Sequence, residues 1–343
     1  MKPMRIFYAA LIFIFGIIAS SCDTIIVNAD EDTKTVAICF PNTTPSWQRN
    51  GDALKKLLEE ENFVVDMKFS DTVEKQQADV EEVIKHRPKC IVIGAIDSAA
   101  FVDTLKPAKD LKIPVIAFDR IIFNTDAVSY YASFDNDSIG DGMGEYFEAA
   151  LNLKSGEGPY NIELFAGGDS DNNAHIFFNN TMKILEPYFN SGQLVCKSGQ
   201  KTFADACVAD WNSENARPRI KELLTKYYAE DTLNVVLSPN DEIAGVILEE
   251  FAAAGKPFPI ISGLDGDPKA FERIRQGQQT FTISKDPDVL TAKCVRMIKA
   301  VVEGTQPDIN DVSTYDNGVI VVPAYLCTPM IIDKTNVDMV KNQ

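Results

Sequence analysis

The 343-residue sequence has few of the side chains on which metal sites and nucleophilic enzymes depend. It contains 2 histidines, and it lacks CxxC, HExxH and any closely spaced set of histidines and cysteines. Structural zinc sites and histidine-based catalytic triads need such sets. We therefore expect no bound metal and no cofactor.

Positive charge is also scarce. The chain has 33 lysines and arginines against 50 aspartates and glutamates, which gives a formal net charge of −17 at pH 7. A protein that binds nucleic acid or another polyanion needs a basic surface to neutralise the phosphates. The charge balance therefore argues against such partners, and it is compatible with a neutral ligand.

A long apolar run occurs only at the N-terminus. Lys2 and Arg5 precede an apolar stretch at positions 6–18, which small residues and then Cys22 follow. This order is typical of a bacterial lipoprotein signal, so we predict a signal peptide over 1–21, acylation of Cys22 and a polar tether over 22–32. A plain signal peptide or an uncleaved anchor is the alternative. No later segment approaches the roughly 18 apolar residues of a membrane span, so we expect an extracytoplasmic chain held to a membrane by lipid.

The remaining cysteines fall into two kinds. Cys39, Cys90 and Cys294 stand in apolar segments, where a free cysteine usually behaves as a small buried hydrophobe, so we expect them in the core. Cys196 and Cys207 are close in sequence, and an oxidising compartment permits a disulfide between them. The sequence leaves their pairing open.

Apolar runs of strand length alternate with amphipathic segments of helical length along most of the chain. This alternation is typical of βαβ units and a parallel sheet, and the mature length suffices for two lobes. The predicted fold class is therefore α/β, with two similar doubly wound parallel-sheet lobes. Expected strands cover 35–40, 63–69, 90–93, 115–118, 128–134, 161–165, 194–197, 234–237, 260–262, 279–284 and 319–326. Expected helices cover 47–61, 73–86, 99–111, 139–151, 174–189, 216–228, 242–254, 268–276 and 287–303.

Four of the apolar runs end in clusters of polar side chains. Ligands of open parallel α/β sheets lie outside the carboxyl ends of the strands, where such clusters would meet. Asp accepts hydrogen bonds, Arg and Lys donate them, and Asn does either, which suits a small ligand rich in hydroxyl groups. Turns and helix caps are the alternative explanation for each cluster, although four of them in register favour a binding site. The clusters are Asp119-Arg120, Asp169 to Asn173, Asn240-Asp241 and Asp265.

One motif-like string and one pair of carboxylates each have a simpler explanation. Gly140-Asp-Gly-Met-Gly144 lies inside a helical pattern and lacks the lysine of a phosphate loop, so we interpret it as a site of close helix packing. Asp171 and Asp265 would be the paired carboxylates of a glycoside hydrolase, which is the enzymatic alternative for this chain. Sugar-binding proteins need the same residues.

The polar strings, in their order along the chain, resemble the periplasmic monosaccharide-binding proteins of ABC importers, and among these the xylose-binding and multiple-sugar receptors. The resemblance covers nearly the whole mature chain. It implies lobe one over 33–135 and 286–320, and lobe two over 136–285 and 321–343, joined by three crossings. The strings are Phe118-Asp119-Arg120, Tyr131 to Asn136, Asp171-Asn172-Asn173-Ala174, Asp210-Trp211-Asn212, Ser238-Pro239-Asn240-Asp241, Ser262-Gly263-Leu264-Asp265 and Asp316-Asn317-Gly318.

The resemblance also assigns ligand roles. Trp47 and Trp211 would sandwich a pyranose, and Lys285 would reach it from the third crossing. Aromatic rings cover the C–H faces of a sugar and leave its hydroxyls to polar groups; the alternative is that both tryptophans are core residues. The remaining contacts are Gln48, Asp119 and Arg120 from lobe one, and Asp171, Asn173, Asn240 and Asp265 from lobe two.

The implied function is that of a receptor, not an enzyme. It would close over a xylose, glucose, galactose or arabinose molecule and deliver it to an ABC permease with its ATPase. We expect a monomer. A sensor that presents its closed form to a chemoreceptor or sensor kinase is the alternative. A transcription repressor of the same fold is disfavoured, because the N-terminus lacks a basic helix-turn-helix.

Overall fold

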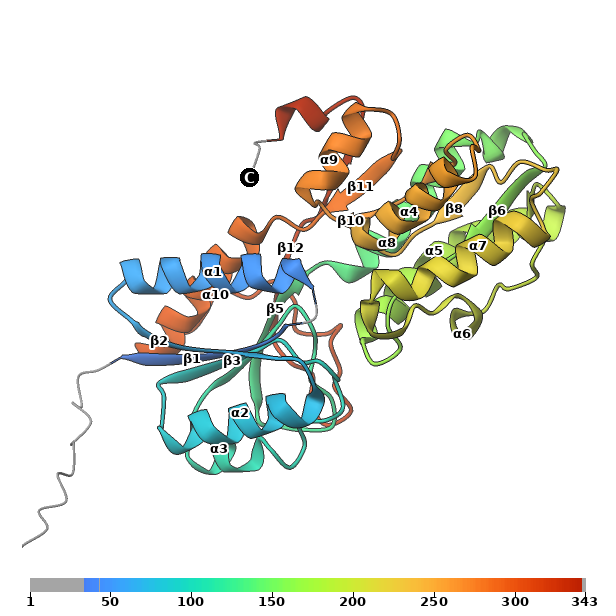
Figure 1. Cartoon of the computed structure of the whole chain (residues 1–343). Coiled ribbons are helices and arrows are strands. Elements are labelled where there is room, and N and C mark those ends of the chain that lie inside the picture. The colour runs from blue at the N-terminus through green and yellow to red at the C-terminus, as the bar shows by residue number, and fades with distance from the viewer. Residues whose placement is uncertain (1–33, 43, 341–343) are drawn as a thin grey trace, which may run out of the picture. The chain divides into compact units, whose positions relative to one another are not determined.

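The computed structural model describes residues 34–42 and 44–340, which belong to one compact unit (Figure 1). The expected signal peptide 1–21, acylation site Cys22 and tether 22–32 lie outside these residues. Across the described part of the chain, no helix combines the length and the apolar character required to span a membrane.

The first sheet has six strands in the order β12-β5-β4-β3-β1-β2, all paired in parallel. Its strands are β1 (Thr35–Pro41), β2 (Val64–Ser70), β3 (Cys90–Ile93), β4 (Val115–Phe118), β5 (Val128–Phe134) and β12 (Ala324–Cys327). Alternate residues of the central strands enter different cores: Val36 and Ile38 pack in one cluster, and Ala37 and Cys39 in the other. Because both faces are covered, the central strands β3 and β4 are apolar throughout.

Helices cover both faces of this sheet. Figure 1 shows α1 (Pro45–Glu60) and α10 (Pro287–Val302) side by side on one face, and α2 (Val73–Lys85) and the short α3 (Lys106–Asp110) on the other. Leu54 of α1 belongs to the core of the first face, and Val80 of α2 to that of the second. This arrangement holds the N-terminus of α1 at the carboxyl end of β1.

The second part of the chain forms a four-stranded parallel sheet, β7-β6-β8-β9, and a three-stranded sheet, β10-β11-β13, in which β13 is antiparallel to β11. Helix α4 packs along α5, and α7 along α8. The strands are β6 (Tyr160–Leu164), β7 (Leu194–Val195), β8 (Val235–Leu237), β9 (Ile260–Ile261), β10 (Leu264–Asp265), β11 (Phe281–Ser284) and β13 (Met330–Asp333). The helices are α4 (Asn136–Ala150), α5 (Asn172–Ser191), α6 (Phe203–Ala206), α7 (Arg217–Lys226), α8 (Asp241–Ala253) and α9 (Pro268–Arg275).

The predicted α/β fold class with parallel sheets is confirmed, with local differences. The helix expected over 99–111 begins only at Lys106, where Pro107 occupies the first turn that proline favours. The strand expected over 319–326 is β12, which starts after Pro323 because proline donates no ladder hydrogen bond. β12 pairs with β5 of the first sheet, whereas the lobe division that the resemblance implies places residues 321–343 in lobe two.

The glycine run of α4 serves helix packing, as predicted. A Cβ atom on Gly140 would lie 2.8 Å from the carbonyl oxygen of Phe177 in α5, and one on Gly144 would lie 2.9 Å from Ile184 Cβ. Both distances are shorter than real Cβ atoms tolerate. The glycines therefore permit the close approach of α4 and α5.

The cysteines with described surroundings are free thiols. Cys39, Cys90 and Cys294 are buried, as predicted, and burial raises the pKa of the Cys39 and Cys90 thiols to about 12. Cys196 lies 3.6 Å from Glu163 Oε2, whereas Cys207 donates to the carbonyl oxygen of Gly167 at 3.3 Å. The disulfide that the sequence left open is not formed.

Candidate functional site

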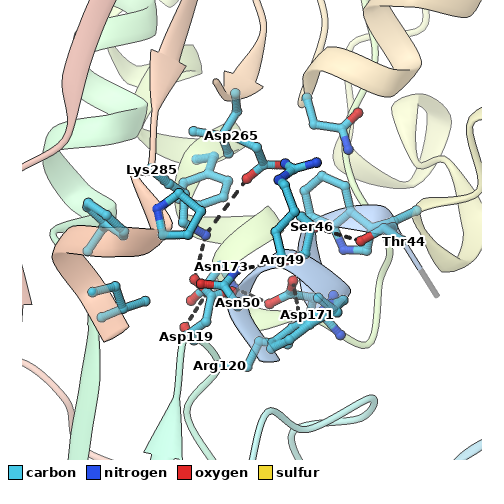
Figure 2. Close-up of a pocket in the computed structure, with 18 residues that line it drawn as sticks. Thr44, Ser46, Arg49, Asn50, Asp119, Arg120, Asp171, Asn173, Asp265 and Lys285 are labelled. Carbon is cyan, nitrogen blue, oxygen red and sulfur yellow. Dashed lines mark hydrogen bonds and ion pairs between the residues drawn. The ribbon is translucent and has the colours of Figure 1, made fainter. Parts of the chain in front are cut away.

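A cleft gathers the carboxyl ends of strands from both parts of the chain with the first turn of α1 (Figure 2). The predicted ligand residues line this cleft, with Gln48 as the exception, and their contact with a ligand stays a prediction. The lining consists of Thr44, Ser46, Trp47, Arg49, Asn50, Asp119, Arg120, Phe134, Asp171, Asn173, Phe177, Trp211, Asn240, Leu264, Asp265, Lys285, Pro287 and Leu290.

Three of the predicted residues have left-handed backbone conformations. The φ angle is 62° at Asp119, which follows β4, 91° at Asp265 of β10, and 55° at Trp211. Such angles are uncommon outside glycine, and they cluster at functional sites, where the surrounding structure holds them in place. The chain therefore directs these side chains into the cleft by unusual backbone turns, two of them at strand ends and the third in the short 3₁₀ helix that ends at Trp211.

Lys285 forms the charged centre of the cleft. Its Nζ lies 2.5 Å from Asp119 Oδ1 and 4.0 Å from Asp265 Oδ1, and Figure 2 shows it between the two carboxylates. Burial acts to lower the pKa of Lys285, but the two carboxylates outweigh it and raise this pKa above its ordinary value. Lys285 therefore stays an ammonium group with N–H donors directed at the cleft.

The surroundings of Asp265 disfavour the ionised form of its carboxyl group. Enclosure in the cleft raises its pKa to about 6, against the opposing effect of Lys285. A quarter of its side chain, 24%, remains exposed. Because ionised Asp265 is incompletely solvated, donors that a ligand brings to its free lone pairs would stabilise it.

A second ion pair closes another side of the cleft. Arg120 Nε lies 2.9 Å from Asp171 Oδ2 but forms no hydrogen bond of good geometry with the described residues, whereas Nη1 donates to the carbonyl oxygens of Ala95 and Ile96 at 3.1 Å. Asp171 also caps α5 by accepting from Asn173 N at 2.9 Å. The carbonyl bonds and the helix cap hold the two side chains in place. The Nε–H group of Arg120 remains as a donor for a ligand in the cleft.

Asn173 and Asn240 combine structural bonds with their place in the lining. Asn173 Nδ2 donates to the carbonyl oxygen of Asp119 at 2.8 Å, which joins the start of α5 to the end of β4. Asn240 caps α8 by accepting from Ile243 N at 2.9 Å. Both the capping interpretation and a position in the cleft therefore hold for Asn240.

The tryptophans are almost buried, with exposed fractions of 5% for Trp47 and 9% for Trp211. Trp47 packs against Phe40, with ring centroids 5.2 Å apart, and the Arg120 guanidinium lies 5.4 Å from its ring centroid. The indole N–H of Trp211 has no partner among the described residues. Both rings belong to the core and also line the cleft, and their stacking on a sugar stays a prediction.

The first turn of α1 contributes other polar residues to the cleft lining than the predicted Gln48, whose contact with a ligand stays a prediction. Gln48 donates to Asn42 Oδ1 at 2.7 Å and is not among the described cleft-lining residues, whereas Arg49 and Asn50 are. At 3.6 residues per turn, Asn50 lies on the same face as Ser46 and Trp47, and Gln48 points the other way. Helical periodicity from Trp47 would have found Asn50. Apolar lining residues such as Phe177 and Leu290 cannot be distinguished from core residues in the sequence.

Acidic groups behind the rim form a separate network. Asp241 is fully buried and accepts hydrogen bonds from Gln279 Nε2 at 2.7 Å, Thr282 Oγ1 at 2.9 Å and Asp267 N at 2.9 Å. Burial, with nearby Asp267, raises its pKa. Asp241 thus ties α8 to β11 and supports the turn after Asp265. Among the described residues, no group of three or more His, Cys, Asp or Glu side chains is placed to hold a metal ion.

Comparison with known families identifies the chain. The periplasmic binding protein domain family matches residues 36–306, most of the sequence. This chain belongs to that family. Membership implies an extracytoplasmic location, and the chain is a binding protein and not an enzyme. The expected family resemblance is thereby confirmed.

This periplasmic binding protein has curated relatives over nearly its full length. It is 38% identical to the multiple sugar-binding periplasmic receptor ChvE of Rhizobium radiobacter, over 90% of this chain and 89% of that one. It is 30% identical to the D-xylose-binding periplasmic protein of Escherichia coli, over 85% and 84%.

Solved structures agree with these relatives. An ABC transporter solute-binding protein of Clostridium phytofermentans with bound β-D-glucose superposes with a TM-score of 0.86 at 37% identity, covering 89% of this periplasmic binding protein and 96% of that chain. A carbohydrate transporter solute-binding protein of Chloroflexus aurantiacus in complex with D-glucose gives 0.82 at 27% identity, covering 90% and 95%.

Proposed function

We propose that this chain is a lipid-anchored receptor that binds one monosaccharide in the cleft and delivers it to an ABC sugar importer. The observation that carries the proposal is the composition of the cleft: two tryptophan rings, carboxylates of Asp119, Asp171 and Asp265, and the cations Lys285 and Arg120. The names of the relatives, which are sugar receptors and glucose-bound proteins, support the same ligand class.

The cleft suits a pyranose for a physical reason. Each sugar hydroxyl both donates and accepts, so it is held best between a carboxylate and an ammonium or guanidinium group, an arrangement that Asp265, Lys285 and Asp119 provide within 4.0 Å. The C–H faces of the ring are apolar and pack on Trp47 and Trp211. D-glucose is our first candidate, with galactose, xylose and arabinose as the other members of the class.

The two-lobe division is part of the proposal. Lobe one holds 33–135 with 286–320, and lobe two holds 136–285 with 321–343; the pairing of β12 with β5 supports a move of residues 324–327 into lobe one. Asp119 and Arg120 would then contact the sugar from one lobe, and Asp171, Asn173 and Asp265 from the other. A ligand that touches both lobes stabilises the closed arrangement.

Titration with sugar should change the tryptophan emission of the protein. The sequence has 2 tryptophans, and both line the cleft, so the whole indole signal reports on the site. We expect a saturable change in intensity or wavelength on addition of the cognate aldose, measured with D-glucose, D-galactose, D-xylose and L-arabinose. Trp47→Phe and Trp211→Phe should each remove part of the change. If calorimetry detects binding while the emission stays constant, neither tryptophan contacts the sugar.

The lipid anchor rests on the order of charged, apolar and small residues before Cys22. We expect metabolic labelling with a palmitate analogue to modify the protein and to place it in the membrane fraction, since diacylglycerol on Cys22 supplies the required apolar chains. Cys22→Ser should lose both the label and the membrane association. Membrane association of this variant without the label would favour an uncleaved anchor, and retention of the label would contradict acylation at Cys22.

A further inference from the structure

The cleft-facing tryptophans rest on glycines that leave no room for a methyl group. A Cβ atom on Gly94, directly after β3, would lie 2.3 Å from Trp47 Cζ3 and 2.6 Å from its Cη2. One on Gly167 would lie 2.2 Å from Trp211 Cζ2 and 2.3 Å from its Cη2. These distances fall 0.8–1.2 Å short of the 3.4 Å at which ordinary contact begins.

We propose that Gly94 and Gly167 are positioning residues that set where the two indole rings stand in the cleft and thereby control sugar affinity. The inference rests on the proposed function, because it concerns the same site. Neither glycine has a positive φ, so the backbone at both positions accepts alanine. The absence of a side chain is therefore required by the rings and not by the chain conformation.

The backbone at both glycines is fixed, so an added methyl group must displace the ring. Gly94 N donates to the carbonyl oxygen of Cys39 at 3.2 Å, and the Gly94 carbonyl accepts from Gln76 Nε2 at 2.8 Å. Phe40 and Phe118, with centroids 5.2 and 6.4 Å from Trp47, block its retreat into the core. Trp47 would thus move toward the space of the ligand.

The backbone around Gly167 is fixed in the same way. The neighbouring Ala166 exchanges backbone hydrogen bonds with Ala206 at 2.8 Å and Val208 at 2.9 Å. Trp211 follows Asp210, and both have positive φ, so the backbone that bears the ring is itself constrained. The unpartnered, buried indole N–H of Trp211 would shift with the ring, which moves a donor that a sugar oxygen can use.

The test measures D-glucose affinity by calorimetry for Gly94→Ala and Gly167→Ala. We expect each to bind at least about tenfold more weakly, because a site needs its contact groups within a fraction of an ångström. Gly142→Ala is the matched control: it lies in α4, its Cβ would meet Ile283 at an ordinary 3.5 Å, and its affinity should equal that of the wild type. An unchanged affinity in both cleft variants would overturn the proposal.

A paired rescue separates positioning from general damage. Phenylalanine lacks the second ring that carries the overlapping atoms, so Gly94→Ala should cost less than about twofold in a Trp47→Phe background and its full amount in a Trp211→Phe background. Gly167→Ala should show the opposite pattern. Equal losses in all backgrounds would contradict the assignment. If Gly94→Ala alone fails to fold, folding restored only by Trp47→Phe supports it, and folding restored by neither substitution overturns it.

Failure of the proposed function has a different signature. A wild-type protein that binds no aldose refutes the sugar receptor but leaves the ring displacement measurable by near-ultraviolet circular dichroism. The indole signal should then still change in Gly94→Ala and Gly167→Ala and stay constant in Gly142→Ala. Constant spectra in all three variants would overturn the positioning role by itself.

Discussion

Replacement of Asp265 by alanine is expected to weaken D-glucose binding by about 10²- to 10⁴-fold. The predicted role of this carboxylate is to accept hydrogen bonds from two sugar hydroxyls, and each bond to a charged group contributes roughly 1.5–3 kcal/mol. The carboxylate also stands 4.0 Å from Lys285 Nζ, so its loss changes the charge balance at the centre of the cleft. Calorimetric titration at pH 7.5 measures the effect.

Asp265→Asn is the matched variant, because asparagine keeps the shape and tolerates the positive φ of 91° better than alanine does. One amide oxygen accepts in place of two carboxylate oxygens, so we expect a loss of about 10- to 100-fold. Equal melting temperatures for wild type and variant would show that the fold persists. An affinity unchanged in both variants would remove Asp265 from the site.

The pH dependence of binding offers a further control on Asp265. Its pKa is raised to about 6 in the ligand-free protein, so below that pH the carboxyl is protonated and accepts less well. Sugar hydroxyls that donate to the ionised form favour it, and wild-type affinity should therefore fall as pH is lowered through 6. Asp265→Asn should lose this part of the pH dependence.

Replacement of Lys285 by methionine is expected to destabilise the protein by about 3–5 kcal/mol at pH 8 and to abolish measurable sugar binding. The ammonium group is the cation shared by Asp119 and Asp265, and the three side chains are mostly buried. Removal of one member of a buried ion cluster leaves uncompensated charge, which is the costly way to break it. Denaturant unfolding and calorimetry measure the two effects.

The destabilisation should depend on pH in a defined direction. Without Lys285 the pKa of Asp265 loses the cation that lowers it and rises further, so protonation at pH 5 discharges this carboxyl and the loss of stability is smaller there than at pH 8. Lys106→Met is the control, because Lys106 and Asp103 form an exposed pair with side-chain exposures of 67% and 89%. Such a pair contributes little. A Lys285→Met protein as stable as Lys106→Met at pH 8 would contradict the account.

The sequence predicted much of this architecture because local patterns determine it. Continuous apolar runs such as 90–93 and 115–118 became buried central strands, and the polar clusters behind them entered one cleft because parallel strands end on the same side. Asp241 shows the limit. The sequence grouped it with Asn240 at the rim, but its donors Gln279 and Thr282 lie just before and within β11, far along the chain, so its complete burial is a long-range property.

The same limit explains the other differences. Gln48 and Asn50 are both polar residues near Trp47, and only the facing of α1 decides which one reaches the cleft. The close contacts of Gly94 with Trp47 and of Gly167 with Trp211 could not be predicted either, because a glycine after a strand is equally consistent with a turn. Pairing of β12 with β5 joins segments almost 200 residues apart, which no local pattern specifies.

The most direct test of the central claim is a calorimetric titration of the wild-type protein with D-glucose at pH 7.5. The account predicts saturable binding of one molecule per chain, and competition between D-glucose and any other aldose that binds, because a single cleft holds the tryptophans and the Asp119–Lys285–Asp265 group. Absence of saturable heat with D-glucose, D-galactose, D-xylose and L-arabinose, from a protein shown to be folded, would contradict it.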